Sequence, residues 1–487
     1  MRTESVAFVI PPSRRAPPLV RDLLHGCWCS GRRVGGIGFP PVTLAGFAGS
    51  VARKGFHPVL LDCPAERIPI ENALFRLENA SSIVVLSSFF SAKEDLSFFE
   101  SLKRRGSRAR LVLVGPFPTF QPELAAMSPA VDAIVRGEPD LALPDLFRLL
   151  EKPWSSPPPQ GTSIRDGDGF TDFGEAVIVE DLNALPFPDR KLISRPHAYR
   201  NPAVCRTPFT TVFSSRGCAS GCRFCPAPGF SQRQVRYRSV DSVIEEVREV
   251  TAMGYREIFF RDENFAGNRQ RVLQLSERFS RLPKPVSWVC SSRADHLDAE
   301  LLREMKRAGC HMVRIGVESG SQKVLDRNGK GIRLSRVVDV FSACRAIGVQ
   351  THAHMMFGMP GETEESLRES LAFIDRISPT MLTVGICTPI PGSLLFEELV
   401  SRVPAVGNLP ASPEGIHTRA VLNQLYCDVS AEKLESAQRK VYRRFYGNPA
   451  RWGSFLLEGI GSLGATRSRI WAAAHVLPFL ARNRGKS

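Results

Sequence analysis

Short apolar segments alternate with longer amphipathic segments through the first 150 residues of the chain. The apolar segments end in Gly, Pro, Ser or a charged residue, and they cover residues 5–11, 57–63, 81–88, 109–116 and 132–138. Short buried strands that alternate with helices predict a parallel sheet with helices on both faces. We therefore expect a Rossmann-like, doubly wound α/β domain over residues 1–151, with ligands at the carboxyl ends of its strands.

A second alternating series begins at residue 209 and predicts another parallel α/β unit over residues 206–400. Its strand-like segments cover residues 209–215, 257–263, 287–293, 311–319, 350–358 and 381–390. Six βα units within about 180 residues are typical of a partial (β/α)6 barrel or of a second open sheet. In either architecture the chemistry belongs at the C-terminal ends of the strands.

The remaining segments are less regular. Residues 152–205 are rich in Pro, Gly and Asp and predict a linker with room for a short hairpin. Residues 401–487 have a mainly helical pattern, and their basic end contains an apolar run, 470–481, that is too short to span a bilayer. Two interpretations of this end remain open: a terminal helix docked on the protein, or a helix on an anionic membrane surface, which would favour a lipid or tetrapyrrole-like substrate.

Composition narrows the class of protein. Hydrophobic residues make up 43% and charged residues 23% of the 487 residues, as in a folded multidomain protein. The net charge of +15 allows nucleic acid, a membrane surface or anionic ligands as partners. The Arg residues are spread along the chain, however, so a background of Arg without functional meaning explains the charge equally well. The N-terminus does not resemble a secretory signal, and no stretch reaches roughly 18 to 20 apolar residues. We expect a cytoplasmic protein with reduced thiols, and association with the cytoplasmic face of a membrane is the alternative.

Three cysteines lie within eight residues of the segment SSRGCASGCRFCPAP, directly after the first strand of the second series: Cys218, Cys222 and Cys225. Soft thiolates select zinc or iron–sulfur clusters. A structural zinc site usually needs four protein ligands, whereas three cysteines leave one iron of a [4Fe–4S] cluster open to a substrate. The motif therefore predicts a [4Fe–4S] cluster with an open iron. Three coincidental core cysteines are the alternative, which suits a Gly- and Pro-rich loop poorly.

This motif, with Phe224 before its third cysteine, resembles the radical S-adenosylmethionine (radical SAM) superfamily. The resemblance implies that the open iron binds SAM and that an electron cleaves SAM to a 5′-deoxyadenosyl radical, which takes a hydrogen atom from the substrate. It also implies an external flavodoxin- or ferredoxin-like electron donor.

Later segments resemble the same superfamily in the same order along the chain. The resemblance places Glu263, with Asp262 as second choice, at the SAM amino group, and Arg293 at the SAM carboxylate. It places Glu318 and Ser319 at other polar groups of SAM, most simply the ribose. Ordinary structural roles, such as an ion pair for Arg293, remain the alternative.

Residues 113–147 resemble the last part of cobalamin-binding domains that precede radical SAM domains, so the whole resemblance spans about residues 1–400. It implies cobalamin near the ends of the first strands, at Ser87, Ser88, Gly115, Thr119, Gly137 and Glu138. Pro116 and Pro118 replace a Gly and a His of that pattern, and the Asp-x-His-x-x-Gly motif that supplies a cobalt ligand is absent. A vestigial domain of the same fold is therefore the alternative.

The resulting hypothesis is a radical SAM enzyme that functionalises an unactivated C–H bond, by cobalamin-dependent methylation of a hydrophobic or natural-product-like small molecule or lipid. A radical cyclase, coupling or oxidative enzyme without methyl transfer is one alternative. A non-catalytic iron–sulfur protein that binds nucleic acid is another, but we expect no nucleic acid because no basic, aromatic-interleaved stripe is present. Cys27 and Cys29 lie in a basic, Gly-rich segment, where a metal site, an anion-binding loop and an exposed loop all remain open.

Overall fold

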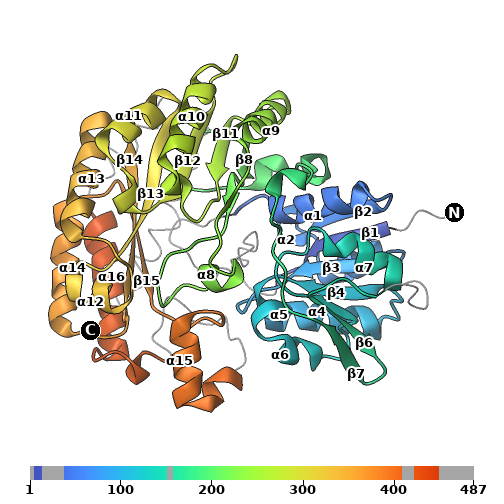
Figure 1. Ribbon diagram of the computed structural model, residues 1–487. Helices are drawn as coiled ribbons and strands as arrows, with labels where there is room; N and C mark the ends of the chain where they lie inside the picture. The colour runs from blue at the N-terminus through green and yellow to red at the C-terminus, as the bar shows by residue number, and fades with distance from the viewer. Residues whose placement is uncertain (1–4, 14–37, 151–156, 409–421, 449–487) are drawn as a thin grey trace.

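The computed structural model describes residues 5–13, 38–150, 157–408 and 422–448, which form two α/β units side by side (Figure 1). Cys27, Cys29 and the C-terminal tail from residue 449 lie outside the described residues, so the predictions for them stay predictions. Among the described helices, none is long and apolar enough to cross a membrane.

The first unit is a seven-stranded sheet in the order β2-β1-β3-β4-β5-β6-β7. Its parallel strands are β1 (Ser5–Ile10), β2 (His57–Asp62), β3 (Ser82–Leu86), β4 (Arg110–Val114) and β5 (Ala133–Val135). Its helices are α1 (Val42–Ala52), α2 (Cys63–Glu66), α3 (Ile70–Arg76), α4 (Ala92–Arg104), α5 (Pro116–Phe120), α6 (Pro122–Ala126) and α7 (Ala142–Leu150). The order of the first five strands is that of a doubly wound, flavodoxin-like sheet.

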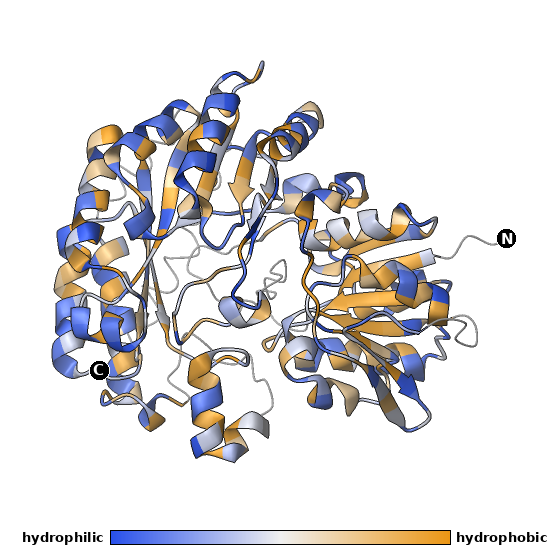
Figure 2. Ribbon diagram, viewed as in Figure 1, coloured by the Kyte–Doolittle hydropathy of each residue, from blue (hydrophilic) through white to orange (hydrophobic). Residues whose placement is uncertain are grey.

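Side-chain alternation along each strand explains the two covered faces. Phe8 of β1 packs in a core with residues of α1 and α7, whereas its neighbours Ala7 and Val9 pack in a second core with α3 and α4. Figure 2 shows these apolar strands in orange between helices whose outer sides are mostly blue. The predicted Rossmann-like domain is confirmed.

The predicted boundary of this domain at residue 151 is wrong for the sheet. Within the expected linker, β6 (Thr162–Asp166) pairs antiparallel with β5, and β7 (Gly169–Phe173) pairs with β6. Gly167, with φ of 58°, occupies the turn between them. β7 reads GFTDF and is exposed or half-buried along its length, so no continuous apolar run marks it in the sequence. The short hairpin foreseen there is thus an extension of the first sheet.

The second unit is a six-stranded, all-parallel sheet in the order β15-β14-β13-β12-β11-β8. Its strands are β8 (Phe209–Val212), β11 (Glu257–Phe260), β12 (Ser287–Ser292), β13 (Cys310–Glu318), β14 (Gln350–Phe357) and β15 (Met381–Ile386). Its helices are α8 (Ala227–Phe230), α9 (Val240–Ala252), α10 (Arg269–Ser280), α11 (Ala299–Arg307), α12 (Gln322–Arg327), α13 (Leu334–Ile347) and α14 (Glu364–Ile377). Helices cover the outer face (Figure 1), and β8 and β15 are not paired, so this is the predicted partial barrel.

The helices α15 (Leu394–Arg402) and α16 (Ala431–Tyr446) follow the last strand. α16 lies along β15, the open edge of the partial barrel. The Tyr442 hydroxyl donates to the Val384 carbonyl at 3.0 Å and accepts from the Val384 N–H at 2.8 Å. Tyr446 does the same for Leu382, at 2.7 and 3.1 Å. Two side chains thus form hydrogen bonds with N–H and C=O groups of β15 that would otherwise be unpaired at the edge of the sheet.

Candidate functional site

The three-cysteine loop lies at the carboxyl edge of the partial barrel, after β8 and the two-residue strand β9 (Ser215–Arg216). Side chains and backbone of neighbouring loops hold its amides. Gly217 N–H donates to Glu263 Oε2 at 3.0 Å, and Cys218 N–H donates to Ser231 Oγ at 3.2 Å. A Cβ on Gly217 would stand 2.0 Å from a backbone oxygen of Gln234, so only glycine allows this approach.

The three thiols lie close enough together to affect one another's pKa values. Burial raises the pKa of the Cys222 and Cys225 thiols, and the positive charge of Lys330 acts in the opposite direction on both. Iron would stabilise the thiolates that burial disfavours. No group of three His, Cys, Asp or Glu side chains in the described ranges is placed to bind one metal ion. An iron–sulfur cluster does not require such a group, because each cysteine binds a different iron.

Arg293 follows β12 and reaches the cysteine loop. Its Nη1 lies 4.0 Å from Cys222 Sγ and 3.4 Å from Ser220 Oγ. Its Nη2 pairs with Asp295 Oδ2 at 2.8 Å and donates to the Lys330 carbonyl at 2.8 Å. The guanidinium is therefore fixed beside Cys222, one of the predicted cluster ligands, and its role at the SAM carboxylate stays a prediction.

Glu318 and Lys330 form a buried ion pair beside Cys222, with 2.9 Å between Nζ and Oε1. Glu318 is the last residue of β13 and has a φ of 68°, a left-handed conformation that is rare outside glycine. A Cβ on Gly316 would lie 2.4 Å from the Glu318 carboxylate, so glycine makes room for the pair. The sequence did not single out Lys330; its position between two glycines in NGKG was the available signal.

Other predicted SAM residues have structural contacts of their own. Asp262 is buried and accepts hydrogen bonds from the Ser214 and Ser215 hydroxyls. Ser319 is fully buried, with its hydroxyl bonded to Ser370 Oγ at 3.1 Å. Phe224 packs in an apolar cluster behind the loop. Glu263, Arg293 and Glu318 thus come together with the cysteines, whereas Asp262 and Ser319 support the surrounding backbone.

Most residues expected near cobalamin serve the first sheet itself. Ser87 Oγ donates to Asp95 at 2.7 Å inside the domain. Thr119 Oγ1 donates to the Gly115 carbonyl at 2.7 Å and accepts from Gly137 N–H at 2.9 Å. A Cβ on Gly137 would stand 2.2 Å from the Val177 carbonyl oxygen, so this glycine permits a close backbone contact.

Glu138 joins the two units rather than facing a ligand. Its carboxylate is fully buried and pairs with Arg236 at 2.8 Å and with Arg216 at 3.3 Å, both from the second unit. Burial alone would raise the pKa of Glu138, but the two guanidinium groups lower it to about 2. Arg216 also forms a bidentate ion pair with Asp140, with 2.9 Å from Nη1 to Oδ2 and 3.0 Å from Nη2 to Oδ1.

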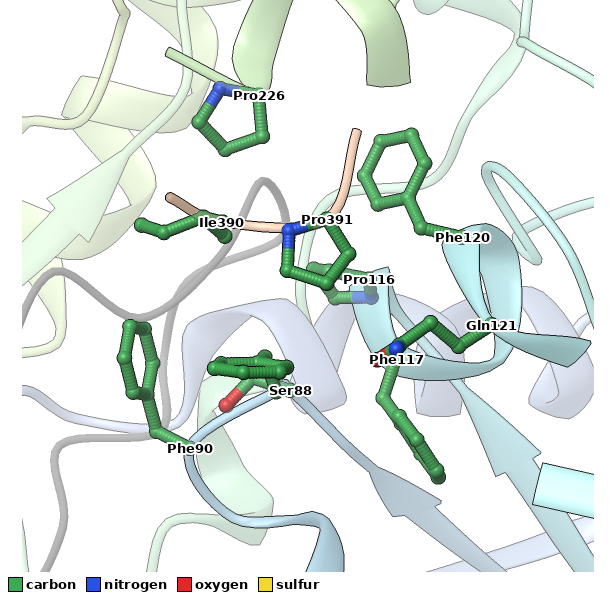
Figure 3. A pocket seen from close by; sticks show the side chains of 10 residues that line it. Ser88, Phe90, Pro116, Phe117, Phe120, Gln121, Pro226, Ile390 and Pro391 are labelled. Atoms are coloured by element: carbon green, nitrogen blue, oxygen red, sulfur yellow. The ribbon is translucent and has the colours of Figure 1, made fainter. Parts of the chain in front are cut away.

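An apolar pocket lies between the carboxyl edge of the first sheet and the second unit (Figure 3). It is lined by residues after β3, residues in and after α5, and two loops of the second unit: Ser88, Phe89, Phe90, Pro116, Phe117, Phe120, Gln121, Pro226, Ile390 and Pro391. Pro226 directly follows Cys225, so the pocket borders the cysteine loop. Of the residues predicted to bind cobalamin, Ser88 lines it.

A doubly wound domain followed by a partial barrel with three loop cysteines defines the class of protein. Residues 212–374 match the family model of the radical SAM superfamily, so the predicted radical SAM domain is confirmed in this part of the chain.

Particular relatives extend over both units. The chain is 27% identical over 406 residues to an uncharacterized methyltransferase of Pyrococcus horikoshii, covering 82% of this chain and 84% of the relative. It is 25% identical over 389 residues to the anaerobic magnesium-protoporphyrin IX monomethyl ester cyclase of Cereibacter sphaeroides, covering 75% of this chain and 61% of that protein. The fold is similar to that of the radical SAM methyltransferase TsrM from Kitasatospora setae, solved with cobalamin and a [4Fe–4S] cluster, at a TM-score of 0.65 and 18% identity over 82% of this chain and 75% of that chain.

Proposed function

We propose that this chain cleaves SAM reductively and methylates an unactivated carbon of a small molecule or lipid in a cobalamin-dependent reaction. The observation that carries the proposal is the apolar pocket of Figure 3, whose lining joins residues at the carboxyl edge of the first sheet to Pro226, the residue after Cys225. A cofactor held by the first domain would therefore face the chemistry of the second. Relatives named as methyltransferases that span both units support the same conclusion.

Cys218, Cys222 and Cys225 would each hold one iron of a [4Fe–4S] cluster, and the cluster when bound supplies the electron that cleaves SAM. Arg293 and Lys330 would present positive charge to the SAM carboxylate. Both cations lie close enough to Cys222 to lower the pKa of its thiol. Carboxylates at Glu263 and Glu318 would accept hydrogen bonds from the SAM amino group or ribose.

The pocket has an empty volume of about 280 Å³, which is too small for a whole corrin, but its apolar lining would meet part of one face of the ring, and cobalamin when bound supplies the methyl group. Phe90, Phe117 and Phe120 would pack against the ring, and the Ser88 hydroxyl would meet a polar edge. Among the described residues, the lining contains no His or Cys, and we expect cobalt without a protein ligand. This agrees with the absence of a cobalt-binding His motif in the sequence.

The substrate would enter the interior of the partial barrel. Half-buried side chains alternate with buried ones along β13, β14 and β15, and Arg314, His354 and Thr383 belong to this half-buried set. His354 lies in register between Gly316 and Thr383. The Glu318–Lys330 pair occupies the space that a side chain at position 316 would fill, so the interior presents polar groups to a substrate rather than a purely apolar wall. An external flavodoxin- or ferredoxin-like protein would supply electrons.

Anaerobic reconstitution with iron, sulfide, cobalamin and a reductant tests the proposal by mass spectrometry. We expect both 5′-deoxyadenosine and S-adenosylhomocysteine, because a second SAM restores the methyl group. Replacing all three loop cysteines by alanine should abolish both products, whereas Cys427→Ala, a buried cysteine distant in sequence from the loop, should retain them. Retained SAM cleavage in the triple variant would overturn the proposal.

A radical cyclisation without methyl transfer is the second candidate, favoured by the similarity to a cyclase. The two reactions separate in the same experiment. Formation of 5′-deoxyadenosine without S-adenosylhomocysteine would support the cyclase-type reaction and exclude methyl transfer.

A further inference from the structure

A Cys–His–Glu cluster lies at the opposite end of the partial barrel from the three-cysteine loop. Cys205 precedes β8, Glu257 is the first residue of β11, and His311 is the second residue of β13. Cys205 Sγ stands 3.4 Å from His311 Nδ1, and His311 Nε2 stands 2.7 Å from Glu257 Oε1. Along β13, His311 and Glu318 are seven residues apart, which corresponds to about 23 Å. The cluster is therefore separate from the radical SAM site.

A β-bulge brings the imidazole into this position. Trp288 pairs with Cys310 and Val289 pairs with Met312, which leaves His311 as the extra residue of β13. Bulges redirect a side chain that regular alternation would place elsewhere. The redirected ring reaches Glu257, although β12 lies between β11 and β13.

Glu257 holds both other members of the cluster. Its carboxylate is fully buried and accepts hydrogen bonds from the backbone N–H groups of Cys205 and Arg206, at 2.9 and 2.6 Å. Burial alone would lower the pKa of His311, but the Glu257 carboxylate and Cys205 raise it to about 10. The ring therefore carries a proton at neutral pH, with one N–H directed to Glu257 and the other to the Cys205 sulfur.

We propose that Cys205 is a nucleophilic thiol, placed beside His311 and oriented with it by Glu257, that reacts reversibly with small disulfides through its thiolate form. A half-buried cysteine beside a protonated histidine has the environment of reactive thiols. The Cys205 thiolate attacks one sulfur of the disulfide, the S–S bond breaks, and a mixed disulfide forms at Cys205. The departing thiolate takes the proton from His311 Nδ1. The small disulfide is the oxidant, so no further redox partner is needed.

Limiting oxidised glutathione, added anaerobically to the reconstituted full-length enzyme at pH 6.5, tests the proposal. Peptide mass spectrometry then gives the rate at which each cysteine forms a mixed disulfide. An ordinary thiol is only about 1% ionised at this pH. A fully ionised thiol has roughly 100-fold more thiolate, but each thiolate is about 10-fold less nucleophilic because its pKa is lower. We therefore expect Cys205 to react about 10-fold faster in the parent enzyme than in His311→Gln.

The pH dependence gives an independent readout. The rate at Cys205 should change little between pH 6.5 and 8.5 in the parent enzyme and rise steeply in His311→Gln, as for an ordinary thiol. His57→Gln, also a histidine at the amino end of a strand, is the matched control and should behave like the parent. Iron content and SAM cleavage in His311→Gln show whether that variant is folded. Equal rates and equal pH profiles in the parent and His311→Gln, or no adduct at Cys205, would overturn the proposal.

Discussion

The buried charge of Glu138 is held by opposite charges from the other unit of the chain. Glu138 follows the short strand β5 and has two arginine partners, Arg216 and Arg236, which follow it by 78 and 98 residues. A buried carboxylate without such partners would take up a proton instead. The ion pairs thus offset the cost of burying Glu138, and they form only when both units are folded.

Glu138→Gln should destabilise the folded chain by about 3 kcal/mol at pH 7, because it leaves the buried Arg236 guanidinium without its carboxylate. Arg216 keeps its pair with Asp140. The measurement is the urea midpoint. Glu364→Gln, which removes an exposed carboxylate that pairs with Lys433, is the control and should leave the midpoint nearly unchanged.

The same pair makes stability depend on pH. The pKa of Glu138 is about 2 in the folded chain, against 4.5 as its ordinary value. The unfolded chain therefore binds more protons between these values, so the contribution is complete above about pH 4.5 and is lost as the pH falls toward 2. The midpoint difference between parent and Glu138→Gln should shrink over that range, and a constant difference would contradict the assignment.

At the scale of elements, α16 substitutes for a missing strand. The edge strand β15 has no further strand beside it in the described sheet, yet side chains of α16 bond to its backbone at alternate residues. Gln438 adds a third contact, donating to the Val384 carbonyl at 2.8 Å. This edge is protected by hydroxyl and amide groups from a helix rather than by charge or by a bulge.

Tyr442→Phe should expose the edge of β15 selectively. The ring remains, but the Val384 N–H loses its hydrogen-bond partner inside a buried region, at a cost of about 1–3 kcal/mol. Hydrogen–deuterium exchange should increase in residues 381–386 more than in the other strands. Phe445→Leu, which weakens α16 packing without touching these bonds, should raise exchange in α16 without selecting β15. Unchanged exchange of β15 in Tyr442→Phe would contradict this role of the helix.

At the scale of the whole molecule, the site lies where the two units meet. The apolar pocket takes its lining from both of them (Figure 3). The ring of Phe120 lies against Gly392 of the second unit. A Cβ on Gly392 would stand 2.3 Å from that ring. The spacing of the units, and with it the width of the pocket, depends on this glycine.

Gly392→Ala should weaken cobalamin uptake while leaving the iron content unchanged, because the added methyl group displaces Phe120 at the pocket but lies outside the cysteine loop. Absorbance of bound cobalamin and colorimetric iron assay measure the two effects. Gly348→Ala is the matched control: it has a similar positive φ, 77° against 87°, but nothing lies within 4 Å of its Cβ position. Equal cobalamin uptake in both variants would show that the contact with Phe120 does not shape the pocket.

Features that depend on neighbouring residues were predictable from the sequence. The strands of both units begin and end within a few residues of the apolar segments, because side-chain alternation and burial are local properties. The cysteine motif was equally clear, since its spacing within one loop carries the chemistry. The hairpin of β6 and β7 had a weaker signal, because it has no continuous apolar run and joins the sheet by pairing with β5.

The sequence by itself determined the two α/β units, their order and the radical SAM motif, because hydrophobic periodicity and cysteine spacing are written along the chain. Only the tertiary structure decided which polar residues face the site. It paired Glu318 with Lys330, directed Glu138 to two arginines instead of a ligand, and joined Cys205 to His311 and Glu257. The physical reason is that a buried polar group must find its partner wherever the fold brings one within hydrogen-bond distance, and that partner lies far away in the sequence.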